Sequence, residues 1–575
     1  MFNNKQIYVM KKVCKKLIYI LIAAVFLVSC NDLLDVNSDR VTFEKDYQLH
    51  SPNDTIYSMI GIYSQLQKLG DSYVLLGELR GDLLDITENS SQDLKDINNL
   101  EISENNPYAN IKDYYAVINN CNYVIHNIDT STIIKGDKVM IRYYAAAKGI
   151  RAWTYMQIAL NFGSAKYYSN PILSVADAEA VNKYPDIAFK ELADSLIADL
   201  IPCKDDKTPS FLGSFLTFPI RFLLGDLYLW RGSITDNQAD YVSAATEYHD
   251  LMLKGIYDVN TIGININYNF QSYWALDDNK RISTTRYMNW YKSFSLNYME
   301  TITGIYCPTE YGQKFDLDSL NYNYQFKPSD VAINNWDSQT YYNTPTNTKP
   351  GDLRKLESII NKNTILSYTT NLISTTSNPV DKTIKNIVFK YLWNGHSDNR
   401  QAITVYRASL LYLRYAEAVN RLNKPNLAFA VLKNGLRSQT MSSAKILPLK
   451  EKTSEKYMDF NAAVFNNNAG IRWRGLGPKL AGSALAVTDC DSTFVIKEQK
   501  DMTDSVKYVE DLIQQELALE TAFEGNRFQD LMRFAIRRKD ASYLANKIYA
   551  KHALSGNAFS KDLTQPDNWY IKVRK

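Results

Sequence analysis

Apolar residues recur at helical spacing along much of the chain, and this periodicity restricts the possible fold more than any other feature. The segments that show it are 56–69, 115–125, 143–160 and 189–200. Gly163 follows the third segment, where a glycine suits the left-handed cap that ends a helix. Helix is expected again from 509 to 537. The spacing predicts a mainly α protein.

Two stretches share an arrangement of large and small residues that is typical of a tetratricopeptide unit. The stretch from 412 to 435 places Ala416 and Ala428 where two helices would approach closely, and the stretch from 224 to 251 repeats the arrangement with a longer loop. Ordinary antiparallel helix packing is an alternative explanation. Under either one, we predict a scaffold of tetratricopeptide-like helical pairs.

The region 259–400 interrupts this pattern. It is rich in Asn, Thr, Ser and Tyr, and it contains four of the eight tryptophans: Trp274, Trp290, Trp336 and Trp393. A disordered linker would be poor in aromatic residues, so we expect an ordered, loop-rich insertion with a few short strands. A second irregular insertion is expected at 441–504.

The N-terminus has the organisation of a secretion signal. Lys11, Lys12, Lys15 and Lys16 precede an apolar run at 17–28, which is shorter than the roughly 20 residues of a membrane-spanning helix. The residues LVSC at 27–30 then resemble a bacterial lipobox, in which cleavage precedes an acylated cysteine. We therefore predict lipidation of Cys30 and attachment of the mature protein to a membrane. An anchor helix with an incidental cysteine is the alternative.

These features divide the chain into seven parts. We expect a signal peptide at 1–29, a tether at 30–50, helical scaffold at 51–258, the loop-rich ligand-binding region at 259–400, a helical pair at 401–440, an irregular insertion at 441–504 and a C-terminal helical segment at 505–575.

Composition excludes several classes of function. Without residues 1–29 the chain carries 60 basic and 62 acidic residues, which argues against a nucleic-acid binder. The six cysteines and five histidines show no metal-ligand spacing. The aspartates at 277–278 and at 316 and 318 could donate oxygens to calcium, but they lack the rest of an EF-hand loop. We expect no metal, and no cofactor other than the covalent lipid.

Tyrosine is unusually abundant, with 41 residues against 22 phenylalanines. An aromatic ring with a polar tip suits a wet recognition surface, where it can stack on a sugar or a peptide side chain. Packing of the loops against the helices explains any single tyrosine equally well. Glycine-rich phosphate loops, the nucleophile elbow and the zinc-protease motif are all absent from the sequence, so it offers no catalytic residues.

Several blocks of sequence, in order, resemble the SusD/RagB family of outer-membrane nutrient-binding lipoproteins. They are GELRGD at 77–82, YAVINNCN at 115–122, RAWTY at 151–155 with Phe162 and Gly163, RYAEA at 414–418, and ETAFEGNRFQDL at 520–531. The proline that the family has shortly after the acylated cysteine is missing from DVNS at 35–38, and the closing segment WYIK at 569–572 lacks the prolines common at the family's C-terminus.

The resemblance implies a SusD-like helical scaffold that docks on a SusC-like TonB-dependent barrel and acts as its lid. The implied function is surface-exposed capture of an oligosaccharide, or alternatively a peptide, without catalysis. A surface-tethered glycan-degrading enzyme and a structural adaptor with helical repeats are the other hypotheses. As ligand-binding residues we predict Arg80, Asp82, Trp274, Trp290 and Trp336.

Overall fold

The structure is a computed structural model that describes residues 49, 51–206, 217–254, 301–308, 314–344, 347–360, 386–391, 400–466, 468–472, 475 and 493–572. The chain divides into two compact units, Met1–Leu49 and His50–Lys575, and all the elements below belong to the second. Cys30, the predicted lipidation residue, lies outside the described residues. Over the part of the chain that is described, no helix combines the length and hydropathy needed to span a membrane.

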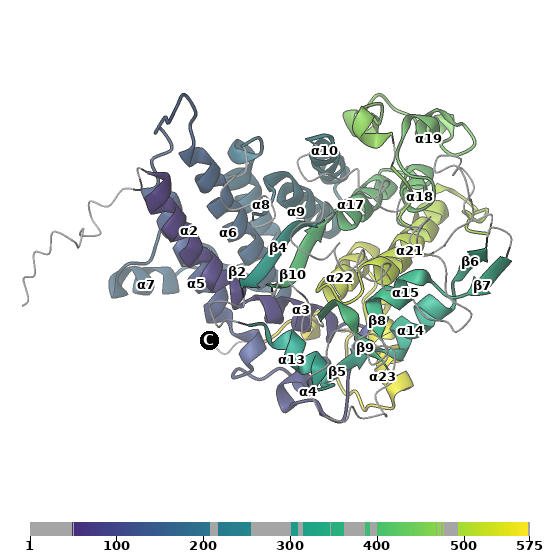
Figure 1. The fold of residues 1–575 in the computed structure, drawn as a ribbon, viewed down its shortest axis with the longest axis horizontal. Helices are drawn as coiled ribbons and strands as arrows, with labels where there is room; N and C mark the ends of the chain where they lie inside the picture. Colours follow the sequence, from purple (N-terminus) through teal and green to yellow (C-terminus); the bar gives the residue numbers. More distant parts are fainter. Residues whose placement is uncertain are drawn as a thin grey trace, which may run out of the picture. The chain divides into compact units, whose positions relative to one another are not determined.

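Long helices of the N-terminal half pack side by side in chain order (Figure 1). They are α2 (Pro52–Gln67), α5 (Ile111–Asn127), α6 (Met140–Phe162), α8 (Phe189–Leu200), α9 (Ile220–Thr235) and α10 (Gln238–Lys254). Each contacts the next, and α10 contacts α17 (Ala408–Arg421), which pairs with α18 (Pro425–Lys433). This array confirms the predicted scaffold of helical pairs.

Glycine residues have two roles in this array: one terminates a helix, and another allows two helices to pack closely. Gly163 follows α6 with φ of 87° and donates its N–H to the carbonyl oxygen of Ala159, so the predicted cap is confirmed. In α9, a Cβ atom at Gly225 would lie 2.3 Å from Cε1 of Tyr248. Only glycine lets the ring of Tyr248 lie directly on the backbone of α9, which brings α9 and α10 close together.

The helix expected from 509 to 537 is two helices, α21 (Met502–Glu520) and α22 (Arg527–Arg538). The first starts earlier than predicted because the side chain of Asp501 accepts the N–H of Asp504. Between the helices, Phe523 and Gly525 have φ of 70° and 88°. Left-handed residues interrupt a right-handed helix, so the expectation of one continuous helix is wrong here.

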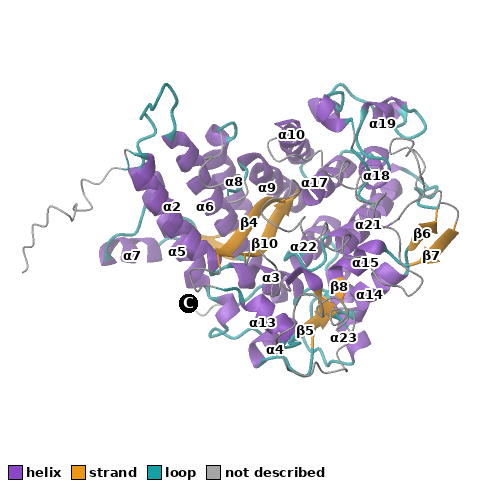
Figure 2. Ribbon diagram, in the orientation of Figure 1, coloured by secondary structure: helices purple, strands orange, loops and turns teal. Residues whose placement is uncertain are grey.

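The described strands form five antiparallel pairs (Figure 2). They are β1 (Leu84–Ile86) with β5 (Phe326–Pro328), β2 (Ser164–Lys166) with β3 (Asp186–Ala188), β4 (Thr301–Pro308) with β10 (Arg400–Arg407), β6 (Thr340–Thr344) with β7 (Asn347–Pro350), and β8 (Ile359–Ile360) with β9 (Ile387–Val388). In the longest pair, β4 and β10, Ile305 lies opposite Ile403 and both are buried. The prediction of a few short strands is confirmed.

The region predicted to be loops with strands also contains helices. They are α13 (Asp316–Tyr322), α14 (Asp330–Asp337) and α15 (Leu353–Ser358). Ser329 and Asp352 cap the last two locally, whereas α13 is capped by Asp71, whose carboxylate accepts the N–H groups at the start of that helix. A cap supplied from a distant part of the chain leaves no local sequence signal.

Further short elements connect these parts. The helices are α3 (Gly70–Glu78), α4 (Gln92–Asn98), α7 (Val175–Asn182), α19 (Ser438–Ser442) and α23 (Ser542–Ser555). The 3-10 helices are η1 (Pro107–Ala109), η2 (Ile201–Cys203), η6 (Phe389–Tyr391), η7 (Leu449–Glu451), η8 (Lys456–Met458), η9 (Ala463–Phe465) and η10 (Pro566–Trp569).

Aromatic rings link the helical array to the long strand pair. The ring of Trp153 on α6 lies 5.6 Å from that of Tyr73 and 4.9 Å from that of Phe218. Tyr406 on β10 stacks on Phe222 of α9 with ring centroids 4.0 Å apart. All five residues are buried. A share of the tyrosine excess therefore belongs to the core.

Candidate functional site

Arg80, predicted to bind ligand, lies in the interior just after α3 and is fully buried. Its Nε donates to the carbonyl oxygen of Leu76 at 2.7 Å and one Nη to that of Trp569 at 3.3 Å. The other Nη donates to the side chain of Asn161. The guanidinium also lies 4.3 Å from the ring centroid of Phe528. These contacts hold the guanidinium inside the protein through three of its five N–H groups.

Asp82, the second predicted residue, is also buried and forms a two-pronged ion pair with Arg527 at the start of α22. Burial raises the pKa of the Asp82 carboxyl, but Arg527 outweighs burial and holds that pKa below its usual value. The pair joins the segment after α3 to the first residue of α22.

Glu78 and Gly77 strengthen the same junction. The Glu78 carboxylate accepts the N–H groups of Phe523 at 3.1 Å and Gly525 at 2.8 Å. A Cβ at Gly77 would lie 1.9 Å from the carbonyl oxygen of Gly525, so the two backbones touch. Burial raises the pKa of Glu78 to about 7 against the opposing effect of these N–H groups.

Trp336 lies on α14 and is 1% exposed. Its Nε1 donates to the carbonyl oxygen of Leu519 at 3.1 Å, and its ring packs against Phe523. Trp336 therefore attaches α14 to α21. Trp274 and Trp290 lie outside the described residues, and their predicted role stays a prediction.

These placements correct the predicted site. Arg80, Asp82 and Trp336 are buried and use their polar atoms within the chain, so we assign them a structural role in place of direct ligand binding. The sequence singled them out because they stand beside the family-like blocks and the aromatic region. Their burial depends on contacts with residues 161, 519–528 and 569, which no local pattern shows.

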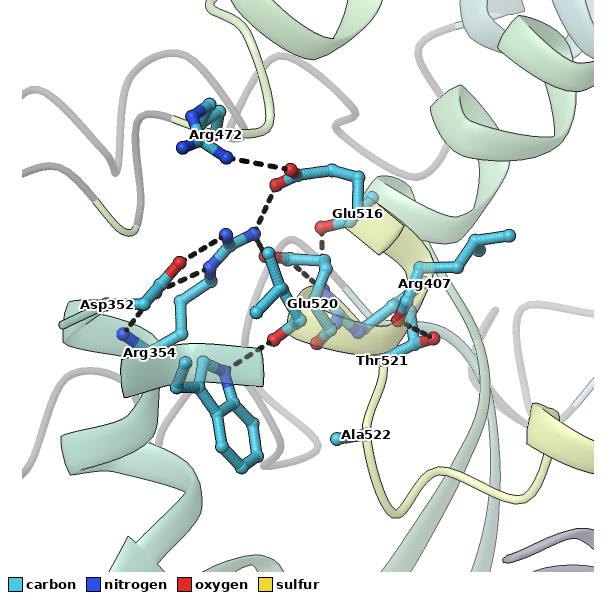
Figure 3. A network of polar contacts seen from close by, with 12 residues as sticks. Asp352, Arg354, Arg407, Arg472, Glu516, Glu520, Thr521 and Ala522 are labelled. Carbon is cyan, nitrogen blue, oxygen red and sulfur yellow. Dashed lines mark hydrogen bonds and ion pairs between the residues drawn. The ribbon is translucent and has the colours of Figure 1, made fainter. Parts of the chain in front are cut away.

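The family-like block at 520–531 begins in a buried ionic network, shown in Figure 3. Arg354 donates to Asp352 at 2.6 Å and to Glu520 at 3.2 Å, and it also pairs with Glu516. Arg407 donates to Glu520 at 2.8 Å. All five side chains are buried. This network connects α15, β10 and α21.

A second part of the network lies between α17 and α22. Glu417 accepts from Arg533 and Arg537, each at 2.6 Å, and Arg414 pairs with Asp530. Buried charges in this arrangement stabilise one packing of the helices, because a charge left without its partner would be costly. The charged residues of the blocks at 414–418 and 520–531 that join this network therefore have a structural role.

Two adjoining cavities lie where the chain between α4 and α5 meets the C-terminal segment. The larger has a volume of about 480 Å³ and is lined by residues 103–107, 109–112, 571 and 572. The smaller has a volume of about 160 Å³ and is lined by Arg80, residues 100–102, Lys561 and residues 568–572. Ile571 and Lys572 line both. We take the pair as the candidate ligand site.

The wall of the smaller cavity contains a strained residue. After α4, the N–H of Leu100 bonds to the carbonyl of Ile97 and that of Glu101 to the carbonyl of Asp96, which is a Schellman ending. Leu100 holds the left-handed position with φ of 56°, where glycine is usual. Backbone strain in non-glycine residues gathers at functional sites.

Lys561 supports this wall. Its Nζ donates to the carbonyl oxygen of Leu100 at 2.6 Å, and the neighbouring Ser560 donates to Glu101 at 3.1 Å. Burial lowers the pKa of the Lys561 ammonium; the carboxylate of Glu101 opposes this and the positive charge of Lys572 adds to it. The segment after α23 thus fixes the loop after α4.

Amide side chains form much of the larger cavity. Asn106 accepts the N–H of Tyr108 and donates to the carbonyl oxygen of Asp93, so it holds η1 in place. Asn110 caps α5 by accepting the N–H of Lys112. Asn105 and Asn568 also line the cavities. Amides, ammonium groups and a tyrosine, Tyr570, can bind a polar ligand through hydrogen bonds and ring contact.

Sequence reasoning named one residue that lines this site, Arg80, and missed the others. The signal available was the run of asparagines in SENNPYAN at 103–110. Its partner segment, 561–572, could not be found because 461 positions separate Lys561 from Leu100. Over the described residues there is no cluster of three or more His, Cys, Asp or Glu side chains able to hold a metal ion.

Solved structures share the fold over most of the chain, whereas no protein-family model and no curated protein sequence matches it. A SusD superfamily protein from Bacteroides vulgatus ATCC 8482 is 14% identical, with a TM-score of 0.52 over 90% of this chain and 95% of that chain. A laminarin binding SusD-like protein is 14% identical, with a TM-score of 0.50 over 87% and 94%. Surface glycan-binding protein A from Bacteroides fluxus is 15% identical, with a TM-score of 0.50 over 89% and 93%. The chain therefore has the SusD-like fold.

Proposed function

We propose that the protein is a glycan-binding lipoprotein of the outer-membrane surface that passes its ligand to a transporter. It is tethered by acyl chains on Cys30, captures an oligosaccharide, and delivers it to a SusC-like TonB-dependent barrel over which it acts as a lid. It binds the ligand without altering it. A peptide is the alternative ligand.

The observation that carries the proposal is the SusD-like fold, shared with proteins whose names state glycan binding. The lipobox-like LVSC at 27–30 supports the membrane tether. Acyl chains contribute roughly 0.8 kcal/mol per buried CH₂, so two or more hold a water-soluble protein at a membrane.

The cavities supply a suitable binding place. The larger, at about 480 Å³, falls within the range of about 300–1,000 Å³ that is usual for small-ligand sites. Asn105 offers an amide donor and acceptor that match the hydroxyl groups of a sugar, whereas Asn106 and Asn110 bond within the chain and shape the wall. The ring of Tyr570 at the smaller cavity packs on Gly163 and gives the wall an aromatic surface.

Binding is tested with purified residues 31–575, titrated calorimetrically against neutral and acidic oligosaccharides and against a peptide digest. We expect heat of binding with a glycan and an unchanged glycan on chromatography afterwards. Appearance of shortened products would establish an enzyme instead. Binding of peptides alone would establish the alternative ligand.

A blocking variant locates the site. Ser103→Trp introduces a large ring at the edge of the larger cavity, and we expect it to weaken glycan binding at least tenfold. The matched control is Ser442→Trp, since Ser442 is exposed on α19, on the opposite side from the C-terminal end in Figure 1. Equal affinity in both variants would place the glycan elsewhere.

A further inference from the structure

The walls of the two cavities carry more positive than negative charge. The lining residues include Arg80, Lys112, Lys561 and Lys572, against the carboxylates of Glu101 and Glu104. The chain beyond residue 29 has slightly more acidic than basic residues, so this excess is local. A cavity with charges of one sign concentrates ligands of the other.

Arg80 is the unusual member of this group. Its guanidinium is fully buried, and its partners are two backbone carbonyls, an amide and an aromatic ring, with no carboxylate within ion-pair distance among the described residues. Most other buried arginines have such a carboxylate, among them Arg151, Arg354, Arg407, Arg414, Arg527 and Arg533, whereas Arg437, which lines neither cavity, also has none among the described residues. A buried charge without a counter-charge is costly, and a bound anion nearby would reduce that cost.

The three lysines are only weakly compensated, since the carboxylate of Glu101 acts on Lys561 without forming an ion pair. Over the described part of the chain, none of Lys112, Lys561 and Lys572 forms an ion pair, and the bond that Lys561 makes is to the neutral carbonyl of Leu100. Lys561 and Lys572 both line the smaller cavity. An oxyanion between two such ammonium groups would replace repulsion by attraction.

The start of α5 adds a weaker contribution. Asn110, Ile111 and Lys112 are the cap and first residues of this 17-residue helix, and all three line the larger cavity. The N-terminus of a helix carries partial positive charge. Asp113 in the same turn offsets part of it, so the lysines and Arg80 remain the main argument.

We propose that these cavities bind an acidic sugar, with its carboxylate or sulfate group held by Lys572 together with Lys561 and Lys112. Arg80 acts through its charge and makes no contact with the ligand. This inference rests on the proposed glycan-binding function and narrows it to anionic saccharides. Neutral amides of the larger cavity bind the hydroxyl groups beside the anionic group.

Calorimetric titration of residues 31–575 tests the inference with an oligogalacturonate, a chondroitin sulfate oligosaccharide and a neutral laminarin oligosaccharide. We expect an acidic ligand to bind at least tenfold more tightly than the neutral one, and its affinity to fall with added salt. The carboxylated and sulfated ligands distinguish the two sources of negative charge. Tighter binding of the neutral ligand would overturn the inference and leave glycan binding intact, whereas binding of no saccharide would overturn both.

Lysine variants test which positive charges bind the anionic group of the sugar. Lys572→Gln and Lys112→Gln replace exposed side chains, so circular dichroism should show an unchanged fold. Each substitution should weaken acidic-sugar binding roughly tenfold to hundredfold. Any neutral-sugar binding should change less than twofold. The control is Lys445→Gln, since Lys445 is exposed and lines neither cavity. Unchanged acidic-sugar affinity in both cavity variants would overturn the proposal.

Discussion

At the scale of single residues, buried charged side chains stabilise the packing of the helices. Glu417 is fully enclosed by α17 and α22 and accepts hydrogen bonds from Arg533 and Arg537, with Arg414 3.6 Å away. Burial raises the pKa of its carboxyl, but the guanidinium groups outweigh burial and hold that pKa well below the usual value. The charged form is therefore the one that the folded state favours.

This arrangement predicts a dependence of stability on pH. Because the Glu417 pKa is lower in the folded than in the unfolded protein, its stabilisation is full above about pH 4.5 and is lost as the pH falls below that value. Urea unfolding at a series of pH values should show a decline between about pH 5 and pH 3 that is shallower in Glu417→Gln. An identical slope in the variant would contradict this reading.

Removing the Glu417 side chain beyond its Cβ should lower the free energy of unfolding at neutral pH. Glu417→Ala leaves buried guanidinium groups without a counter-charge, and such changes cost about 3–5 kcal/mol of unfolding free energy. Glu498→Ala is the matched control, since Glu498 is exposed and outside the ionic network, and it should change stability by less than about 0.5 kcal/mol.

At the scale of elements, the fold depends on one close contact between α3 and the break between α21 and α22. Gly77 and Gly525 touch through their backbones, and Glu78 accepts N–H groups of the break. Gly77→Ala would place a methyl group within 1.9 Å of the carbonyl oxygen of Gly525, so α3 must move away. We expect a loss of about 1–3 kcal/mol in unfolding free energy, measured by urea titration.

The matched control lies on α2. A Cβ at Gly61 would have no heavy atom within 4 Å, so Gly61→Ala should stabilise the protein by about 0.5–1 kcal/mol through its effect on helix propensity. Opposite signs for the same substitution at the two glycines would show that the close approach, and not glycine itself, matters at Gly77. Stabilisation by both would exclude the contact.

These contacts also show what the sequence could predict. Helices α5, α6 and α8 followed from periodicity, and Gly163 from its position after an apolar stripe, because those signals are local. The capping of α13 by Asp71 and the burial of Trp336 were not predictable, since both depend on residues far along the chain. The cavities escaped prediction for the same reason: their walls come from opposite ends of the second unit.

At the scale of the whole molecule, the proposed function assigns ligand binding and membrane attachment to different parts of the chain. The helical array and the cavities lie in the unit His50–Lys575, whereas the proposed attachment point, Cys30, belongs to the unit Met1–Leu49. If acyl chains at one thiol provide the only tether, removing that thiol should release the protein without altering its fold or its affinity for a saccharide.

We therefore expect Cys30→Ala to prevent both lipid labelling and membrane attachment in cells. The wild-type chain should incorporate radioactive palmitate and sediment with outer membranes, while the variant should remain unlabelled and fail to sediment with them. Matched variants at Cys121 and Cys203, which are buried cysteines of the folded unit, should keep the label. Purified Cys30→Ala should bind the same saccharides as residues 31–575 with equal affinity. Labelling of the Cys30 variant, or its continued presence in the outer-membrane fraction, would mean that another part of the chain holds the protein at the membrane. That result would contradict attachment through Cys30.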